Sequence, residues 1–264
     1  MTKKVVAFSG GKDSTAMLIR LIELGEQIDD IIFADTGFEF PELYTYIKRI
    51  EKYIGRKITI VQPNKDFWEW AEGKVTRGKN KGEVRGLPLR AYPCWWTREA
   101  KIIPLSKLQK DAGVVFIGIA KDEENRVSKQ EGHNYRYPLV EWGWSEQDCI
   151  DYLNKKGLFN PLYVNFNRLG CYWCPKQSES SLFVLWKNYP ILWNKSKDME
   201  LWNKKHGKGL LFAKSLFDLE KAFEQGKQPK KLPKYDCWDG CESVKKAFVM
   251  KQCDLFEFNK KLGN

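Results

Sequence analysis

The chain has 264 residues, of which 42% are hydrophobic and 30% charged, and its formal net charge is +11. This composition is ordinary for a globular protein, and the length allows one large domain or one domain with an appendage. No apolar run approaches the roughly 20 residues that span a bilayer, and the N-terminus leads directly into an apolar stretch. We therefore expect no membrane segment, no signal peptide and a cytoplasmic location. The positive charge favours polyanionic partners such as nucleotides or nucleic acid.

A strand, a glycine turn and a helix are predicted at the N-terminus. An apolar strand at residues 5–8 precedes the loop, and an amphipathic helix is predicted over about residues 14–25. The loop consists of Ser9, Gly10, Gly11, Lys12, Asp13 and Ser14. Glycines let the backbone approach a ligand, helix N-terminal amides favour an anion, and the lysine adds a positive charge. The loop predicts a phosphate site that does not fit the Walker A spacing, with an ordinary strand-to-helix turn as the alternative.

Further strands and helices alternate along the first half of the chain. Strands are predicted at residues 31–34, 58–61 and 114–118, and a helix over residues 41–53. The alternation predicts an α/β fold with a parallel, twisted sheet covered by helices on both faces. The basic, glycine-rich residues 72–90 are interpreted as a long mobile loop, functional or merely a solvated insertion.

After residue 160 the alternation stops, and helical stretches are predicted over about residues 179–205 and 210–226. A linker at residues 226–234 and a short cysteine-containing tail follow. We therefore expect a nucleotide-binding domain over residues 1–176 and a helical C-terminal region over residues 177–264, whose tail returns a cysteine hairpin to the site.

Three segments are expected to meet where the parallel strands end. They are the loop at residues 9–14, the turn Asp35, Thr36 and Gly37, and the segment from Gly118 to Arg126. The carboxylate of Asp35 is a candidate for holding a ribose or a magnesium ion, or else it closes its own turn or caps the next helix. Arg126 is a candidate for pairing with a phosphate or sulfate, or else it forms a salt bridge with Glu123.

The seven cysteines of a cytosolic chain argue for metal, cluster or redox chemistry rather than disulfides. Cys171 and Cys174 form a C-x-x-C ligand pair. The candidates for the further ligands are Cys94, Cys237 and Cys241. Cys149 lies in a helical pattern and is interpreted as a core residue, and no motif surrounds Cys253. An iron–sulfur cluster, a zinc ion and free thiols all remain open.

Seven segments together resemble the PAPS reductase family, a branch of the PP-loop ATP pyrophosphatase superfamily. The loop at residues 9–14 is similar to the family's S-G-G-x-D-S. Other similar segments lie, in family order, at residues 34–42, 97–105, 118–126, 138–142, 160–163 and 170–175. The resemblance implies an adenine nucleotide alpha-hydrolase-like fold, adenylyl-nucleotide binding and chemistry on sulfur.

The chain departs from the family pattern in two places. Adenylyl-sulfate reductases of the family hold a [4Fe–4S] cluster with a Cys-Cys pair and a C-x-x-C, but the pair falls at Trp96 and Thr97 here, with Cys94 two residues before the first. The reductases also end in E-C-G-[LI]-H, which bears the catalytic cysteine, and the end of this sequence has no such motif. These departures favour ATP activation over reduction of an adenylyl sulfate.

The expected enzyme is thus an AMP-forming ATP pyrophosphatase that activates an acceptor for sulfur transfer. The alternatives are an adenylyl-sulfate or phosphoadenylyl-sulfate reductase and a non-catalytic nucleotide-binding subunit of a larger assembly. Lys12, Asp13 and Arg126 are the catalytic candidates, and the loop at residues 9–14, Asp35, Thr36, Gly37 and Gly118 the nucleotide-binding ones. The expected cofactors are ATP or an adenylyl sulfate, Mg²⁺, and a [4Fe–4S] cluster with zinc as the alternative. The expected partners are a nucleic-acid acceptor, a sulfur-donor protein and a second copy of the chain.

Overall fold

The computed structural model describes residues 2–127 and 134–230. At the centre of these residues lies a five-stranded sheet with the strand order β3-β2-β1-β4-β5, in which every neighbouring pair is parallel. The strands are β1 (Lys4–Phe8), β2 (Asp30–Ala34), β3 (Thr59–Val61), β4 (Val114–Ile117) and β5 (Tyr135–Arg136). The predicted parallel α/β sheet is therefore confirmed, with one additional short edge strand, β5.

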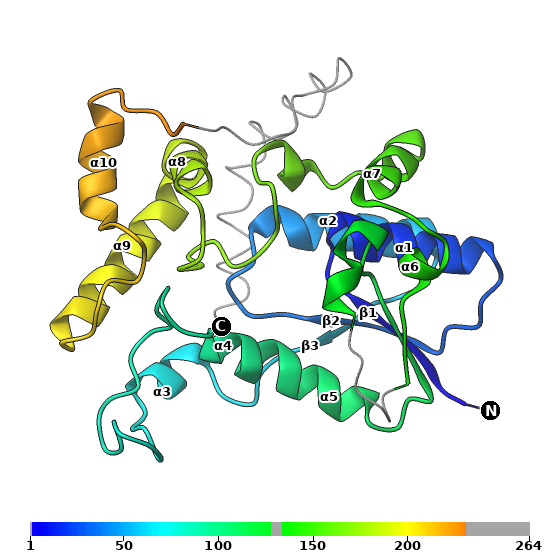
Figure 1. The fold of residues 1–264 in the computed structure, drawn as a ribbon, viewed down its shortest axis with the longest axis horizontal. Coiled ribbons are helices and arrows are strands. Elements are labelled where there is room, and N and C mark those ends of the chain that lie inside the picture. The colour runs from blue at the N-terminus through cyan, green and yellow to red at the C-terminus, as the bar shows by residue number, and fades with distance from the viewer. Residues whose placement is uncertain (1, 128–133, 231–264) are drawn as a thin grey trace.

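Helices cover both faces of the sheet (Figure 1). One face carries α1 (Lys12–Glu23), α2 (Pro41–Ile54), α6 (Pro138–Glu141) and α7 (Glu146–Lys155). The other face carries α4 (Trp95–Thr97), a π-helical turn (Arg98–Ile102) and α5 (Ile103–Gln109). Because side chains alternate along a strand, Val6 and Phe8 of β1 belong to the larger core, whereas Val5 packs in a smaller core that Leu105 of α5 contacts.

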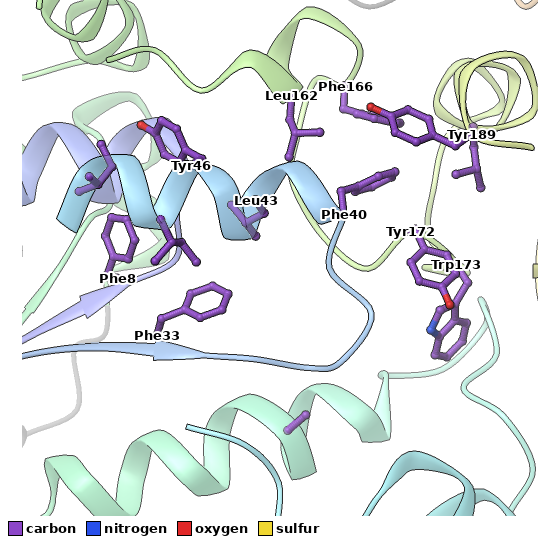
Figure 2. Packing of buried hydrophobic residues seen from close by; sticks show 14 of the residues in the cluster. Phe8, Phe33, Phe40, Leu43, Tyr46, Leu162, Phe166, Tyr172, Trp173 and Tyr189 are labelled. Carbon is purple, nitrogen blue, oxygen red and sulfur yellow. The ribbon is translucent and has the colours of Figure 1, made fainter. Parts of the chain in front are cut away.

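The larger core extends from the sheet into the C-terminal half of the chain. Figure 2 shows Phe33 of β2 below Leu43 of α2, and Phe40 facing Phe166 and Tyr189. The ring centroids of Phe40 lie 4.6 Å from Phe166 and 5.1 Å from Tyr189. Burial of these aromatic side chains, each worth about 1.5 to 3 kcal/mol, holds the start of α2 against the segments that follow residue 160.

The C-terminal region contains α8 (Glu179–Asn188), α9 (Pro190–Lys205) and α10 (Leu216–Glu224). The helical stretch predicted over residues 179–205 is broken at Tyr189, whose φ of −134° and ψ of 60° are not helical. The break has a local cause, because the residue before a proline is disfavoured in the helical conformation. The domain boundary near residue 176 stays a prediction, and the tail with Cys237, Cys241 and Cys253 lies outside the described residues.

Within the segment predicted as a long mobile loop (residues 72–90), residues 73–86 form a hydrogen-bonded hairpin, which we call the basic hairpin. It follows α3 (Phe67–Glu72), and Lys74 pairs with Val84 in an antiparallel bridge. The Val75 amide donates to the Glu83 carbonyl at 2.8 Å, and the Arg85 amide donates to the Gly73 carbonyl at 2.8 Å. These bonds satisfy backbone groups that a structureless loop leaves to water.

None of the described helices is both long enough and apolar enough to span a membrane.

Glu23 joins α1 to α7, the two helices that flank the loop at residues 9–14. Its carboxylate pairs with Lys156 and accepts a hydrogen bond from the Tyr152 hydroxyl at 2.6 Å. Burial opposes the charged form, but the bonds from Lys156 and Tyr152 outweigh it and lower the pKa of Glu23. A carboxyl with a lowered folded-state pKa stabilises the protein above its unfolded-state pKa, and this stability is lost as the pH falls through the folded-state pKa.

We therefore expect Glu23→Gln to lower the free energy of unfolding by about 0.5 to 1 kcal/mol near neutral pH. Urea unfolding of both proteins at about pH 7 and about pH 3 tests this, because the acidic pH lies below the ordinary pKa of a glutamate, so that the unfolded wild-type chain binds a proton there and the difference should shrink. A difference of the same size at both pH values would show that the charge of Glu23 does not matter.

Candidate nucleotide and thiol site

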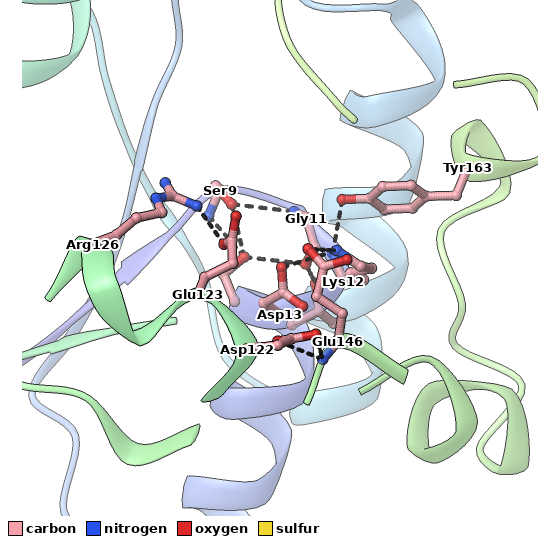
Figure 3. A network of polar contacts seen from close by, with 11 residues as sticks. Ser9, Gly11, Lys12, Asp13, Asp122, Glu123, Arg126, Glu146 and Tyr163 are labelled. Atoms are coloured by element: carbon pink, nitrogen blue, oxygen red, sulfur yellow. Dashed lines mark hydrogen bonds and ion pairs between the residues drawn. The ribbon is translucent and has the colours of Figure 1, made fainter. Parts of the chain in front are cut away.

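The loop at residues 9–14 connects the end of β1 to the start of α1 and is closed by its own hydroxyls (Figure 3). The Ser9 and Ser14 hydroxyls lie 2.9 Å apart, and the Ser9 amide donates to the Ser14 hydroxyl at 3.2 Å. Gly11, the N-cap residue of α1, has no side chain that could cap the helix, although the Lys12 amide in the first turn donates to the Tyr163 hydroxyl. An uncapped helix N-terminus presents amides that favour an anion.

Two glycines allow the close approach on which the loop depends. Gly10 has a φ of +70°, and a Cβ there would lie 2.5 Å from Leu43 Cδ1 of α2. Gly118, directly after β4, lies against the first turn of α1, where a Cβ would lie 2.7 Å from the Ser14 Cα atom. Because that neighbour is backbone, it cannot rotate away. Gly118 therefore sets how closely the end of β4 approaches the loop, and its contact with a nucleotide stays a prediction.

Gly118→Ala is expected to displace the first turn of α1 and to weaken nucleotide binding by about tenfold, since overpacking of this kind costs about 1 to 3 kcal/mol. Calorimetric titration with ATP measures the effect. Gly209→Ala is the matched control, because its Cβ would meet Leu89 Cδ1 at an ordinary 3.8 Å. Equal affinities for ATP in the two variants would contradict the proposed close approach.

Lys12 is a buried cation with two carboxylate partners. Its side chain is nearly inaccessible, and its Nζ atom lies 3.2 Å from Asp13 Oδ2 and 2.9 Å from Glu146 Oε1 of α7. Burial opposes the ammonium form, but Asp13 and Glu146 outweigh it and raise the pKa of Lys12. The lysine therefore stays charged throughout the physiological range.

Asp13 provides the one acidic group within the loop. Burial raises its pKa, and the neighbouring Lys12 limits the rise. Asp13 Oδ2 faces Lys12, whereas the buried Oδ1 atom has no hydrogen-bond partner among the described residues. A buried oxygen without a partner is costly unless a ligand or ion completes it. A carboxylate oxygen of this kind fits a divalent cation such as Mg²⁺, which prefers oxygen ligands.

Two further residues support the loop from the segment after α7. The Tyr163 hydroxyl accepts a hydrogen bond from the Lys12 amide at 3.2 Å, and the buried Asn160 side chain donates to the Gly10 carbonyl at 2.9 Å. Asn160 caps the short 3₁₀ helix Pro161–Val164. The sequence did not assign these residues to the site. Their only signal was that they lie in one of the segments that resemble the PAPS reductase family.

The turn after β2 lies beside the same edge of the sheet, with all three predicted residues in it. Asp35 Oδ1 accepts hydrogen bonds from the Gly37 amide at 2.8 Å and from the Tyr44 hydroxyl at 2.7 Å. Asp35 Oδ2 accepts from Gln62 at 3.3 Å. These bonds correspond to the alternative in which Asp35 closes its own turn. Contact of Asp35 with a ribose or a magnesium ion stays a prediction.

The segment after β4 forms a 3₁₀ helix, Lys121–Arg126. Arg126 pairs with Glu123, as the alternative interpretation expected, and its side chain is 61% exposed (Figure 3). An exposed ion pair is worth about 0 to 1 kcal/mol. Little free energy therefore holds the guanidinium in this pair, and its role toward a phosphate stays a prediction.

The C-x-x-C pair forms a tight turn, in which the Cys174 amide donates to the Cys171 carbonyl at 3.0 Å. This turn is joined to the turn after β2. The Tyr172 amide donates to the Phe38 carbonyl at 2.9 Å, and the Cys171 sulfur lies 3.4 Å from the Thr36 hydroxyl. Burial and the nearby Glu39 raise the pKa of Cys171 to about 12, against the effect of Lys101. The predicted thiols and the predicted nucleotide residues therefore share one edge of the sheet.

Both cysteines of the pair line a cavity of about 220 Å³, together with Arg168 and Lys176. Cys94 is the N-cap residue of α4 and is partly buried. Among residues 2–127 and 134–230, no three histidine, cysteine or carboxylate side chains gather closely enough to hold a metal ion. The described residues thus provide a two-thiol turn beside a cavity, whereas Cys237 and Cys241 lie outside the described residues.

Several known proteins and one family profile are similar to this chain. The profile of the phosphoadenosine phosphosulfate reductase domain matches residues 3–177. An uncharacterised protein of Methanocaldococcus jannaschii is 34% identical over 206 residues, which cover 72% of this chain and 40% of that protein. The adenosine 5′-phosphosulfate reductase 1 of Bacillus subtilis is 29% identical over 174 residues, which cover 60% of this chain and 67% of the reductase. This chain spans less than half the length of the Methanocaldococcus jannaschii relatives that it matches.

A solved structure gives a weaker match. The U34-tRNA thiolase NcsA from Methanococcus maripaludis with its [4Fe-4S] cluster is 18% identical and covers 90% of this chain and 76% of its own, with a TM-score of 0.41. The profile match contains the loop at residues 9–14, the turn after β2 and the C-x-x-C pair, which the fold brings to one edge of the sheet. The chain therefore belongs to the phosphoadenosine phosphosulfate reductase domain family.

Proposed function

We propose that this protein is a PP-loop enzyme that splits ATP into AMP and pyrophosphate to activate an acceptor for sulfur transfer. The observation that carries the proposal is the contact between the cysteine turn and the turn after β2. The Cys171 sulfur lies 3.4 Å from the Thr36 hydroxyl, in the turn that borders the nucleotide loop. A thiol that contacts the turn next to the loop at residues 9–14 suits a reaction in which activation and sulfur delivery follow each other at one site.

The first step is attack of an acceptor oxygen on the α-phosphorus of ATP. The new bond joins that oxygen to phosphorus, the bond to the bridging oxygen breaks, and pyrophosphate leaves with both electrons. The amides at the start of α1 and the ammonium of Lys12 stabilise the charge that develops on the phosphates. The unpartnered Asp13 Oδ1 atom would hold the Mg²⁺ that accompanies ATP, and this ion would neutralise phosphate charge.

In the second step, a sulfur nucleophile at the oxidation level of sulfide attacks the activated acceptor carbon. A carbon–sulfur bond forms, the carbon–oxygen bond breaks, and AMP leaves. Cys171 and Cys174 would hold an iron–sulfur cluster with further ligands from Cys94, Cys237 or Cys241, and zinc is the alternative occupant. The two-thiol turn and the cavity beside it fit such a group. A bound cluster would supply iron that carries the sulfide.

The products made from ATP test this proposal. Protein purified without oxygen is incubated with ATP and Mg²⁺, with and without total cellular RNA, and the nucleotides and phosphates are separated by chromatography. We expect AMP and pyrophosphate in equal amounts, formed slowly with water as the acceptor and faster with the true acceptor. ADP with orthophosphate would overturn the proposal.

Reduction of an adenylyl sulfate is the second candidate, and the likeness to the Bacillus subtilis reductase favours it. Release of sulfite from adenylyl sulfate or its 3′-phospho form, with a dithiol as reductant, would support this activity. Binding of ATP without any turnover would instead support a nucleotide-binding subunit.

A further inference from the structure

The basic hairpin and the end of α9 together form one positively charged surface, which we call the basic surface. It contains six exposed cations: Lys74, Arg77, Lys79 and Lys81 on the hairpin, and Lys204 and Lys205 at the end of α9. None of the six forms an ion pair with another residue in the described part of the chain. Their charges are therefore available to an external anion.

Two contacts hold the halves of the basic surface together. Lys208, just after α9, pairs with Glu83 of the hairpin at 3.1 Å. The buried Leu87 amide donates to the Asn203 side chain of α9 at 3.1 Å. At the base of the hairpin, the Arg85 guanidinium lies 4.9 Å from the centre of the Trp70 ring. The hairpin that carries four of the six cations is thus held in place by contacts with residues outside it.

Aromatic rings border the basic surface and form what we call the aromatic ledge. It consists of Trp68 of α3, which is 38% exposed, with Trp202 and the exposed His206 at the end of α9. The ring centroids of Trp68 and Trp202 lie 5.5 Å apart, and the Trp202 and His206 rings are stacked at 3.9 Å. Partly exposed rings beside cations are the arrangement on which unpaired bases stack while the phosphates meet positive charge.

The aromatic ledge continues inward to the cysteine turn. Trp68 contacts Phe67 at 5.3 Å, and Phe67 contacts Trp173 at 5.1 Å, between Cys171 and Cys174 in the sequence. The buried rings of Phe67 and Trp173 therefore connect the aromatic ledge to the turn that holds the two thiols.

We propose that the basic surface and the aromatic ledge bind a single-stranded polynucleotide. Its phosphates contact the six cations and an unstacked base lies on Trp68. Insofar as this polynucleotide is the acceptor for sulfur, the inference rests on the proposed function, but the binding itself does not. Base stacking on a side chain requires bases that are free of a duplex, which favours single strands.

Fluorescence anisotropy with the full chain tests the binding. The probes are a labelled uridine oligonucleotide, a labelled thymidine oligonucleotide and a duplex of the same length, each titrated at several salt concentrations. We expect both single strands to bind more tightly than the duplex, and the RNA and DNA arms show which sugar is preferred. The quadruple variant Lys74→Gln, Arg77→Gln, Lys79→Gln, Lys81→Gln should lower the slope of log K against log salt by about 0.7 for each phosphate that the protein no longer neutralises. It should also weaken binding at least about tenfold.

A matched control removes the same charge elsewhere: Lys52→Gln, Arg56→Gln, Lys107→Gln, Lys110→Gln, all exposed and outside the basic surface. Trp68→Ala should weaken single-strand binding about tenfold without changing the salt slope, because it removes stacking and no charge. Trp68→Leu, which keeps apolar contact with Phe67, should lose affinity equally. Thermal unfolding verifies that each variant is folded.

Equal loss of affinity in the hairpin variant and its control would overturn the proposal, as would duplex binding as tight as single-strand binding with no effect of Trp68→Ala. Failure here is distinguishable from failure of the proposed function. AMP formation from ATP without polynucleotide binding would refute only the surface, and polynucleotide binding without AMP formation would refute only the ATP chemistry.

Discussion

Replacing Lys12 with Met is expected to lower the rate of AMP formation from ATP by about 100- to 1,000-fold, the usual effect of removing one group that stabilises transition-state charge. The methionine keeps most of the volume of the lysine but removes the ammonium. In the folded protein that ammonium is buried between Asp13 and Glu146. Without it, the carboxylates of Asp13 and Glu146 remain unneutralised, and they would repel the phosphates of ATP that the ammonium is expected to attract.

Lys121→Met is the matched control for this variant. Lys121 lies after β4, pairs with Glu124 and has a side chain that is 48% exposed. Its replacement removes the same charge near the site but leaves the ammonium of Lys12 in place. The rate of AMP formation should therefore change by less than about twofold. A Lys12→Met enzyme with the activity of the control, at equal thermal stability, would exclude Lys12 from phosphate chemistry.

Replacing Cys171 with Ala is expected to remove bound metal and abolish sulfur transfer while leaving AMP formation largely intact. The reason is the division of the site, since Cys171 contacts Thr36 rather than the loop at residues 9–14. Iron and zinc content, visible absorbance and AMP formation are measured on the same sample. A protein that binds iron should lose its broad absorbance, whereas a zinc protein should lose zinc and show no colour in either form.

Cys149→Ala is the matched control, because Cys149 is fully buried in α7 and lies outside the C-x-x-C pair. It should keep its metal and lose only about 1 kcal/mol of stability from the small cavity. Metal content that survives Cys171→Ala, or falls equally in both variants, would refute the assignment of Cys171 as a ligand.

The sequence predicted the elements whose pattern is local. β1, β2 and β4 are short apolar runs that the sheet buries on both faces, and the structure confirms each within one residue. β5 was missed because it has only two residues, one of them Arg136, and no periodicity can be read from so short a segment. The glycines of the basic hairpin favour a flexible loop when only the sequence is considered, so its pairing is not predicted. Gly78 and Gly82 in fact have positive φ and turn a paired chain.

Contacts between distant residues could not be predicted in the same way. The loop at residues 9–14 was recognised from its own sequence, but the hydrogen bond from Lys12 to Tyr163 joins residues 151 positions apart. The pairing of Lys12 with Glu146 likewise depends on how α7 packs against α1. Local pattern therefore identified the loop at residues 9–14 as a candidate phosphate site, whereas only the tertiary structure shows which side chains support the loop and that Cys171 contacts the neighbouring turn.

The fate of ATP labelled in its α-phosphate tests the central claim most directly. With Mg²⁺ and without oxygen, the proposed function predicts that the label appears in AMP while pyrophosphate forms in equal amount, and that Lys12→Met suppresses both. Label found in ADP, with orthophosphate as the second product, would contradict it.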